Sequence, residues 1–299
     1  MEEKKWRSGF IVLLGYPNSG KSSLLNRLIE EPHFSIVTNK AQTTQSRILG
    51  IRNGSDYQAI FVDTPGLLSP KDALHEYMLS EIGRACSGAD IVLWVLDSTR
   101  GVEMSSRERS YMEDIGRSSI PCIRVLNKID KLPKGLDKGI SGSVGLEAET
   151  PWSWVSARRG WGIDTLWSKI YDRLPFHPPY YPLDQLSDRN DRFLMAEIIR
   201  KHIFLLYDKE IPYSCAVLLR SFEEGEKLVR MESIIYTERD SQKGILIGRQ
   251  GRALTQLGKL ARQDMERFLS KRVYLAIRVK VQPLWKREKR GLKRVGIGN

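Results

Sequence analysis

Short apolar runs alternate with stretches of helical spacing along the first 175 residues. The runs have the length of buried strands, and the other stretches repeat apolar residues at helical intervals. The expected strands are Phe10–Leu14, Ser46–Arg52, Tyr57–Val62, Ala89–Asp97, Pro121–Leu126 and Trp152–Val155, and the expected helices are Ser23–Ile29 and Ile163–Leu174. Strands that alternate with helices form mostly parallel sheets covered on both faces. The pattern therefore predicts a doubly wound α/β domain.

The pattern changes after a proline-rich stretch, Leu174–Pro182, which predicts a linker. Beyond it we expect an amphipathic helix at Asp191–Tyr207, strands at Cys215–Leu219, Leu228–Thr237 and Val273–Val281, and a helix at 252–269. This order predicts an α+β domain. We accordingly divide the chain into an α/β domain at 1–175, a linker at 176–190, an α+β domain at 191–284 and a basic tail at 285–299.

A phosphate-binding loop is predicted directly after the first strand. Residues Gly15–Ser22 have the spacing G-x-x-x-x-G-K-S, and the expected helix follows. Glycines at both ends let the backbone wrap a polyphosphate with its N–H groups pointing inward. Lys21 would add a positive charge and Ser22 a hydroxyl for Mg²⁺. The alternative, a glycine-rich turn with an incidental lysine, loses weight because companion motifs follow.

The companion motifs come at the ends of later strands, where an α/β sheet places functional groups. Asp63-Thr64-Pro65-Gly66 follows the third strand, and Asp63 is positioned to hold Mg²⁺ while the Gly66 N–H approaches the γ-phosphate. Asn127-Lys128-Ile129-Asp130 follows the fifth strand. The Asp130 carboxylate would accept hydrogen bonds from guanine N1 and N2, which adenine cannot offer. The segment Ser156–Arg158 would reach guanine O6 with its backbone.

Together these elements predict a P-loop NTPase fold of the Ras-like GTPase kind, with GTP or GDP and Mg²⁺ as cofactors. The residues expected to bind the nucleotide are Gly15, Asn18, Ser19, Gly20, Lys21, Ser22, Ser23, Asp63, Gly66, Asn127, Lys128, Asp130, Ser156, Ala157 and Arg158. Leu67 stands where many signalling GTPases carry a glutamine that orients the attacking water. We therefore expect GTP hydrolysis with slow intrinsic turnover.

Charge is distributed unevenly along the chain. Residues 242–299 hold 16 of the 48 Lys and Arg residues but only 3 of the 36 acidic residues, which gives this segment a formal net charge of +13. The other residues together have a formal net charge of −1. A concentrated basic segment favours a polyanionic partner, either nucleic acid or an anionic membrane. No apolar run approaches the ~20 residues that span a bilayer, the N-terminus does not resemble a secretory signal, and the three dispersed cysteines fit a reducing compartment. We expect a cytoplasmic protein.

These motifs resemble those of the Era family of bacterial GTPases. The similar segments are Pro17–Asn26, Gln42–Thr44, Asp63–Leu67, Asn127–Asp130 and Ser156–Arg158. The resemblance implies that Thr43 or Thr44, of which we favour Thr44, senses Mg²⁺, so that Ser22, Thr44 and Asp63 hold the metal. It also implies a K⁺ ion beside Asn18, which would replace the missing glutamine. Lys21, Thr44, Asp63 and Gly66 would then be the catalytic set.

The resemblance continues into the second half. Glu210–Ser214 is similar to the segment that opens the Era C-terminal domain, and Gly244–Gly251 carries a G-x-x-G loop before a helix. This order resembles a type II KH domain, whose loop lets an RNA backbone come close. The residues expected to contact RNA are Lys243, Ile247, Gly248, Arg249, Gln250, Gly251 and Arg252.

The resemblance implies a GTP-switched protein that binds the single-stranded 3′ end of small-subunit (16S) ribosomal RNA and assists maturation of the 30S subunit; no DNA partner is expected. The alternative is a GTPase on the cytoplasmic face of the inner membrane, its basic tail on anionic lipid. The tail shows no amphipathic apolar face in the sequence, which disfavours that account. Two segments depart from the family: Gly135–Thr150, expected to be a loop or irregular helix, and residues 285–299, which either bind RNA phosphates or are disordered.

Overall fold

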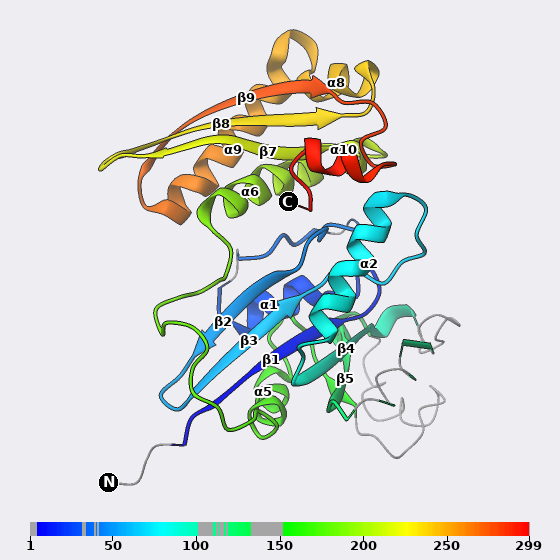
Figure 1. The fold of residues 1–299 in the computed structure, drawn as a ribbon, viewed down its shortest axis with the longest axis vertical. Helices are drawn as coiled ribbons and strands as arrows, with labels where there is room; N and C mark the ends of the chain where they lie inside the picture. The colour runs from blue at the N-terminus through cyan, green and yellow to red at the C-terminus, as the bar shows by residue number, and fades with distance from the viewer. Residues whose placement is uncertain are drawn as a thin grey trace. The chain divides into compact units, whose positions relative to one another are not determined.

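The computed structural model describes residues 5–31, 34–38, 40, 42–100, 110–111, 113, 117, 119–132 and 152–298. The chain forms two compact units, Met1–Leu68 with Met78–Asp188, and Ser69–Tyr77 with Arg189–Asn299 (Figure 1). The expected loop at Gly135–Thr150 lies outside the described residues.

The first unit is built on a six-stranded sheet with the order β2-β3-β1-β4-β5-β6. Its strands are β1 (Arg7–Leu14), β2 (Ile48–Asn53), β3 (Tyr57–Asp63), β4 (Ile91–Asp97), β5 (Cys122–Asn127) and β6 (Ser153–Trp154). All neighbours run parallel except β2, which forms an antiparallel hairpin with β3. Alternate residues of β1 therefore face two different cores. The doubly wound sheet predicted from the sequence is confirmed.

Helices cover both faces of this sheet. On one face, α1 (Lys21–Leu28) and α5 (Ile163–Tyr171) contribute Leu24, Leu28 and Leu166 to a core with Ile11 and Leu13. On the other face, α2 (Ala73–Cys86) contributes Ile82 and Ala85. Among the described residues of this unit, short 3₁₀ turns follow β4 and β5 at η1 (Ser98–Arg100) and η2 (Ile129–Lys131), and in the second unit η4 (Arg249–Gly251) is a further such turn. The carboxyl ends of β1, β3, β4 and β5 consequently meet at one edge of the sheet.

The expected linker packs along the edge of this sheet. The Ile51 N–H donates to the Leu186 carbonyl at 2.9 Å, and the Ser187 hydroxyl donates to the Leu49 carbonyl at 2.7 Å. The buried Gln58 side chain accepts from the Tyr180 and Tyr181 N–H groups. Residues as far as Asp188 therefore belong to the first unit, although the sequence places a linker from residue 176.

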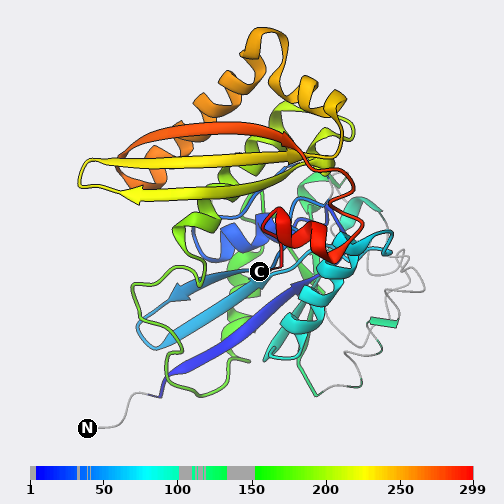
Figure 2. The ribbon, with the colours of Figure 1, turned by 45° about the horizontal axis from the view of Figure 1, so that its top comes forward.

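The second unit packs helices against one face of a three-stranded sheet, β7-β8-β9, whose strands lie side by side in Figure 2. Its elements are α6 (Asp191–Leu206), α7 (Ile211–Ser214), β7 (Ala216–Glu224), β8 (Leu228–Thr237), α8 (Asp240–Ile247), α9 (Arg252–Leu269), β9 (Arg272–Val281) and α10 (Lys289–Arg294). Strand β8 pairs antiparallel with β7 and parallel with β9. Met195, Met231, Leu246, Leu257 and Met265 meet in its core. Strand β7 runs five residues beyond the expected Leu219, through a register shift.

The basic C-terminal segment is folded through Gly298. Trp285 is fully buried, its indole N–H donates to the Ser214 carbonyl at 3.1 Å, and Leu292 and Val295 are buried with it. This segment does have an apolar face, contrary to the expectation from the sequence. These apolar side chains are buried, so disorder does not describe the segment, and its exposed side chains are charged: Arg287, Glu288, Lys289, Arg290, Lys293 and Arg294. Within the described chain, no helix combines the length and apolar character needed to cross a membrane.

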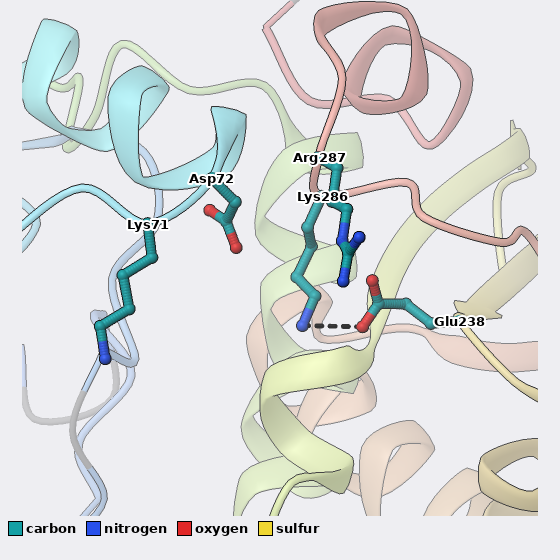
Figure 3. A pocket seen from close by; sticks show the side chains of 5 residues that line it. All are labelled: Lys71, Asp72, Glu238, Lys286 and Arg287. Carbon is teal, nitrogen blue, oxygen red and sulfur yellow. Dashed lines mark ion pairs between the residues drawn. The ribbon is translucent and has the colours of Figure 1, made fainter.

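A pocket of about 440 Å³ lies in the second unit where the segment that begins α2 meets the C-terminal segment (Figure 3). Lys71, Asp72, Glu238, Lys286 and Arg287 line it, and Lys286 pairs with Glu238 at 2.8 Å. The Leu74 N–H donates to the Lys286 carbonyl. Helix α2 thus begins in the second unit and ends in the first.

Candidate nucleotide site and RNA-binding loop

The predicted phosphate loop joins β1 to α1, and its glycines are required by close backbone approach. A Cβ on Gly15 would lie 2.2 Å from the Val95 carbonyl oxygen, and one on Gly20 would lie 2.3 Å from the Asn127 amide nitrogen. Gly20 has φ 93° and Asn18 has φ 66°, so the loop turns through left-handed conformations. Helix α1 begins directly at Lys21, and its N-terminal N–H groups face the loop.

Lys21 is buried at the centre of this loop. Its ammonium donates to the Gly15 and Tyr16 carbonyls at 3.0 and 2.9 Å. Burial lowers the pKa of Lys21 to about 8, and the nearby Asp63 carboxylate partly offsets that effect. Phosphate oxygens beside this ammonium would favour its charged form. The geometry suits a lysine that neutralises a polyanion.

Three hydroxyl groups converge on one oxygen of Asp63. Ser22, Ser35 and Thr44 donate to Oδ2 at 2.6, 3.2 and 3.3 Å, and Ser22 lies 3.2 Å from Thr44. Burial raises the pKa of the Asp63 carboxyl against the opposing effects of Lys21 and these hydroxyls. The other oxygen, Oδ1, is buried without a hydrogen-bond partner.

This cluster fits Mg²⁺. The ion takes hard oxygen ligands, and in phosphate sites it uses one or two carboxylates together with phosphate oxygens and water. Asp63 offers the carboxylate with a free oxygen, while Ser22 and Thr44 offer the hydroxyls. The hydroxyl of Thr44 bonds to Asp63 and lies 3.2 Å from the Ser22 hydroxyl, so Thr44 belongs to the cluster. Ser35 was not expected from the sequence; an amide pair with Asn26, at 2.8 and 3.0 Å, fixes its backbone.

The turn after β3 is held against the phosphate loop. A Cβ on Gly66 would meet Pro17 at about 2.5 Å, so only glycine permits this approach. The Leu67 N–H donates to the Gly15 carbonyl at 3.1 Å, and the Leu67 side chain is buried in the core facing α2. Leu67 therefore cannot orient a water molecule, as its apolar nature already indicated.

The base-reading residues form a connected network. The Asn127 amide donates to the Ser19 carbonyl at 3.0 Å, and its oxygen accepts from the Ala157 N–H at 3.1 Å. The Ser156 hydroxyl donates to Asp130 at 2.6 Å. Arg27 donates to the Ala157 and Arg158 carbonyls and so supports the same loop. Ser23 lies half-buried on α1 beside Ser22. The structure thus brings the phosphate loop and the base-reading loops together.

Asp97, at the end of β4, was not identified from the sequence. Its carboxylate pairs with the Lys128 ammonium at 2.6 Å, and that ammonium also donates to the Asn18 carbonyl. Burial alone would raise the pKa of Asp97, but hydrogen bonds from Lys128 and Thr99 outweigh it and lower the pKa below the usual value. Asp97 therefore positions Lys128 between the two nucleotide loops.

We expect Asp97→Asn to weaken nucleotide binding. The amide cannot neutralise Lys128, and a lost hydrogen bond to a charged group costs about 1–2 kcal/mol, a factor of roughly 5–30 in affinity. Titration of labelled GDP measures the change. Asp184→Asn, on the exposed linker, is the matched control. Preference for guanine over xanthine should stay unchanged, because Asp130 is untouched; an affinity equal to that of the control would contradict the assignment.

The G-x-x-G loop lies between α8 and α9. Gly248 has φ 72° and ψ 176°, a combination open essentially to glycine alone. Gly251 and Gln250 also have positive φ. Leu246 anchors the loop, because its side chain is buried and its carbonyl accepts from the Tyr207 hydroxyl at 2.8 Å.

Basic and apolar side chains surround this loop. Arg249, Gln250 and Arg252 are exposed, and Lys243 and Ile247 are half-buried. Ile245, which the sequence analysis did not select, is 52% exposed on the same helix. The arrangement offers backbone access, positive charge and an apolar surface together, as a single-stranded RNA site requires.

The fold and the two sites define a P-loop GTPase with a C-terminal KH domain. Residues 10–128 match the family model described as "50S ribosome-binding GTPase", and residues 210–286 match that of the KH domain. A GTPase Era from Geobacter sp. (strain M21) is 40% identical and covers 99% of each chain. A chloroplastic GTPase ERA1 from Zea mays is 37% identical over 98% of this chain and 71% of its own.

Solved structures agree. A crystal structure of Era in complex with MgGDPNP and nucleotides 1506–1542 of 16S ribosomal RNA superposes with a TM-score of 0.91 at 35% identity, covering 97% of this chain and 99% of that one. A variant of Aquifex aeolicus Era bound to GDP·AlF4⁻ gives 0.88 at 34% identity, with the same coverage. The chain belongs to the Era family of GTPases. The resemblance inferred from the sequence is confirmed, and with it GTP hydrolysis and the use of Mg²⁺.

Proposed function

We propose that this GTPase binds the unpaired 3′ end of small-subunit ribosomal RNA through its KH domain, and that bound GTP or GDP sets its RNA affinity during 30S maturation. The observation that carries the proposal is the presence of both sites in one chain: the Asp63 hydroxyl cluster and the Gly248–Gly251 loop. A relative of nearly the same length and fold has been crystallised with MgGDPNP and 16S ribosomal RNA. That complex supports the same pair of ligands here.

In this proposal the nucleotide residues divide into three roles. Lys21 and the loop N–H groups hold the phosphates; Ser22, Thr44 and Asp63 hold Mg²⁺; and Asp130 with Ala157 reads guanine. Mg²⁺, when bound, neutralises charge on the phosphate oxygens. Gly66 brings its N–H toward the terminal phosphate. Asn18 has a positive φ in the phosphate loop. We propose that a K⁺ ion binds beside Asn18 and supports hydrolysis, since the buried Leu67 cannot orient the attacking water.

The RNA contacts we propose are Lys243, Ile247, Gly248, Arg249, Gln250, Gly251 and Arg252. Gly248 and Gly251 would admit the backbone, and Arg249 and Arg252 would meet phosphates. Unpaired bases would lie against Ile247 and the exposed Ile245.

Coupling between the sites would pass through the segment after Gly66. Nucleotide-dependent ordering is typical of the loops that touch the γ-phosphate. Here Ser69–Tyr77 belongs to the second unit, where Leu74 bonds to Lys286, and helix α2 continues into the first. A change at the phosphate end of this segment would thereby reach the KH unit.

The test is to titrate one RNA, the 3′ end of 16S ribosomal RNA, with protein saturated by a non-hydrolysable GTP analogue and by GDP. We expect Kd values that differ at least severalfold. Equal values would defeat the switch while leaving RNA binding intact. We propose a cytoplasmic location. The membrane alternative is less well supported, because Trp285, Leu292 and Val295 of the C-terminal segment are buried and offer no apolar surface to a bilayer.

A further inference from the structure

One face of the three-stranded sheet in the second unit is open along β9, whereas the C-terminal segment reaches the same face over β7, where a Cβ on Gly296 would lie 2.6 Å from Leu218, and Ile234 of β8 is only 6% exposed. Odd-numbered residues of β9, including Val273 and Ile277, point into the core with α6 and α9. Even-numbered residues therefore point to the opposite face. Among them Arg272, Tyr274, Arg278 and Lys280 are exposed, and Tyr274 is 60% exposed. β9 is also an edge strand, the orange-red arrow of Figure 2.

The cations in this row differ from three cations on the helical side of the same unit, which are paired. There, Lys201 and Arg267 both pair with Asp264, and Arg262 pairs with Glu266. Within the described chain, no ion pair or hydrogen bond engages the side chains of Arg272, Arg278 or Lys280. Unpaired cations in a regular row have no evident structural purpose.

The neighbours of the row leave its positive charge uncompensated at one end. In the register of β8 and β9, Ile234 stands opposite Arg278, and Tyr236 stands opposite Lys280. Two acidic residues share the face, but Glu232 stands opposite Ala276 and Glu223 pairs in register with Arg230. The end with Arg278 and Lys280 therefore combines charge with an aromatic ring, and the acidic residue that follows at this end of β8, Glu238, pairs with Lys286 at 2.8 Å.

We propose that the open face of β9, with Tyr274, Arg278 and Lys280, is a second RNA contact that grips the sugar–phosphate backbone next to the strand held by the G-x-x-G loop. Successive cations on one face of a strand are about 7 Å apart, so the row can follow a chain of phosphates without reading bases. A G-x-x-G loop clamps only about four nucleotides, and longer RNA needs further cations. This inference rests on the proposed RNA-binding function.

The experiment compares two RNAs that share the same unpaired 3′ end: one of about eight nucleotides, twice the length that a KH loop clamps, and one extended upstream to the span of nucleotides 1506–1542. The proteins are the wild type, Arg278→Glu with Lys280→Glu, and the control Lys293→Glu with Arg294→Glu. The control changes one lysine and one arginine, both exposed on α10, so net charge is matched. Arg278→Gln with Lys280→Gln tests the loss of charge without reversal.

We expect the wild type to bind the longer RNA more tightly than the short RNA. In the β9 variants the affinity for the longer RNA should fall roughly tenfold or more, while the affinity for the short RNA stays unchanged. The slope of log Kd against log salt should fall by about 1.4, for two contacts to a single strand. GTP hydrolysis and melting temperature should match those of the wild type.

Equal losses in the β9 and α10 variants would overturn the proposal, because net charge alone would then explain them. It would also be wrong if the β9 variants lost binding to phosphatidylglycerol vesicles and kept full affinity for the longer RNA. Failure of the wild type to bind even the short RNA would instead defeat the proposed function, and this inference with it.

Discussion

Asp130→Asn should exchange the preference for guanine nucleotides for a preference for xanthine nucleotides. The carboxylate can accept from both N–H donors of guanine, whereas an amide presents a donor to one of them. Losing one charge-assisted hydrogen bond and leaving one guanine donor facing an amide donor together cost about 3–5 kcal/mol, roughly a hundredfold to several thousandfold in GDP affinity. Xanthine carries an oxygen in place of the 2-amino group, so it accepts from the new amide.

The surrounding network should survive this substitution. Oδ1 of Asp130 accepts from the Ser156 hydroxyl at 2.6 Å, and the amide oxygen of asparagine can accept the same bond. The Ala157 N–H keeps its bond to Asn127. Calorimetric titration with GDP and with xanthosine diphosphate measures both sides of the exchange, and Asp184→Asn controls for the change of charge. A variant that still prefers GDP would show that the base is read elsewhere.

Gly248→Asp should abolish most RNA affinity and spare GTP hydrolysis. The backbone of Gly248 has φ 72° and ψ 176°, a conformation that costs about 1–3 kcal/mol for a residue with a side chain. A Cβ at this position would also lie 2.6 Å from the Cβ of Ala253. The substitution also places a negative charge where phosphates would pass. We expect RNA binding to weaken by roughly a hundredfold or more, since strain and repulsion act together.

A pair of variants at Gly251 separates charge from strain. Gly251 has φ 76°, and a Cβ there meets nothing within 4 Å. Asparagine and aspartate tolerate this left-handed conformation better than other residues. Gly251→Asp should therefore weaken RNA binding more than Gly251→Asn, with equal melting temperatures. Electrophoretic mobility shift and phosphate-release assays on the same samples check both functions; unchanged RNA affinity in all three variants would remove the loop from the RNA site.

The strands and the phosphate loop could be predicted because their signals are local. A buried parallel strand is an apolar run such as Ile91–Leu96, and the phosphate loop is a contiguous motif, Gly15–Ser22, although the contacts that require its glycines come from the distant Val95 and Asn127. Both candidate sites are predicted from such contiguous stretches of sequence. Thr44 was favoured over Thr43 only through the family resemblance, and its bond to Asp63 now supports that choice.

Features that depend on distant partners could not be predicted. Asp97 lies at the end of a strand, as many acidic residues do, so its position alone indicates no function. Its ion pair with Lys128 forms only because the fold brings the two residues together. Trp285, Leu292 and Val295 stand among six cations between residues 285 and 295, so their pattern resembles a solvated tail. Burial of Trp285 depends on the Ser214 carbonyl, 71 positions away in the sequence. Local periodicity carries no information about such pairs.

The path of the segment from Pro175 to Asp188 has a practical consequence for isolating the GTPase unit. Strand β2 forms one margin of the six-stranded sheet, and Leu186 and Ser187 occupy hydrogen-bonding groups that would otherwise be open to another molecule. Bare sheet margins recruit strands from neighbouring chains. A fragment that stops at residue 175 should therefore self-associate through β2. A fragment that continues to residue 188 should stay monomeric, because its own residues 186 and 187 occupy those hydrogen-bonding groups.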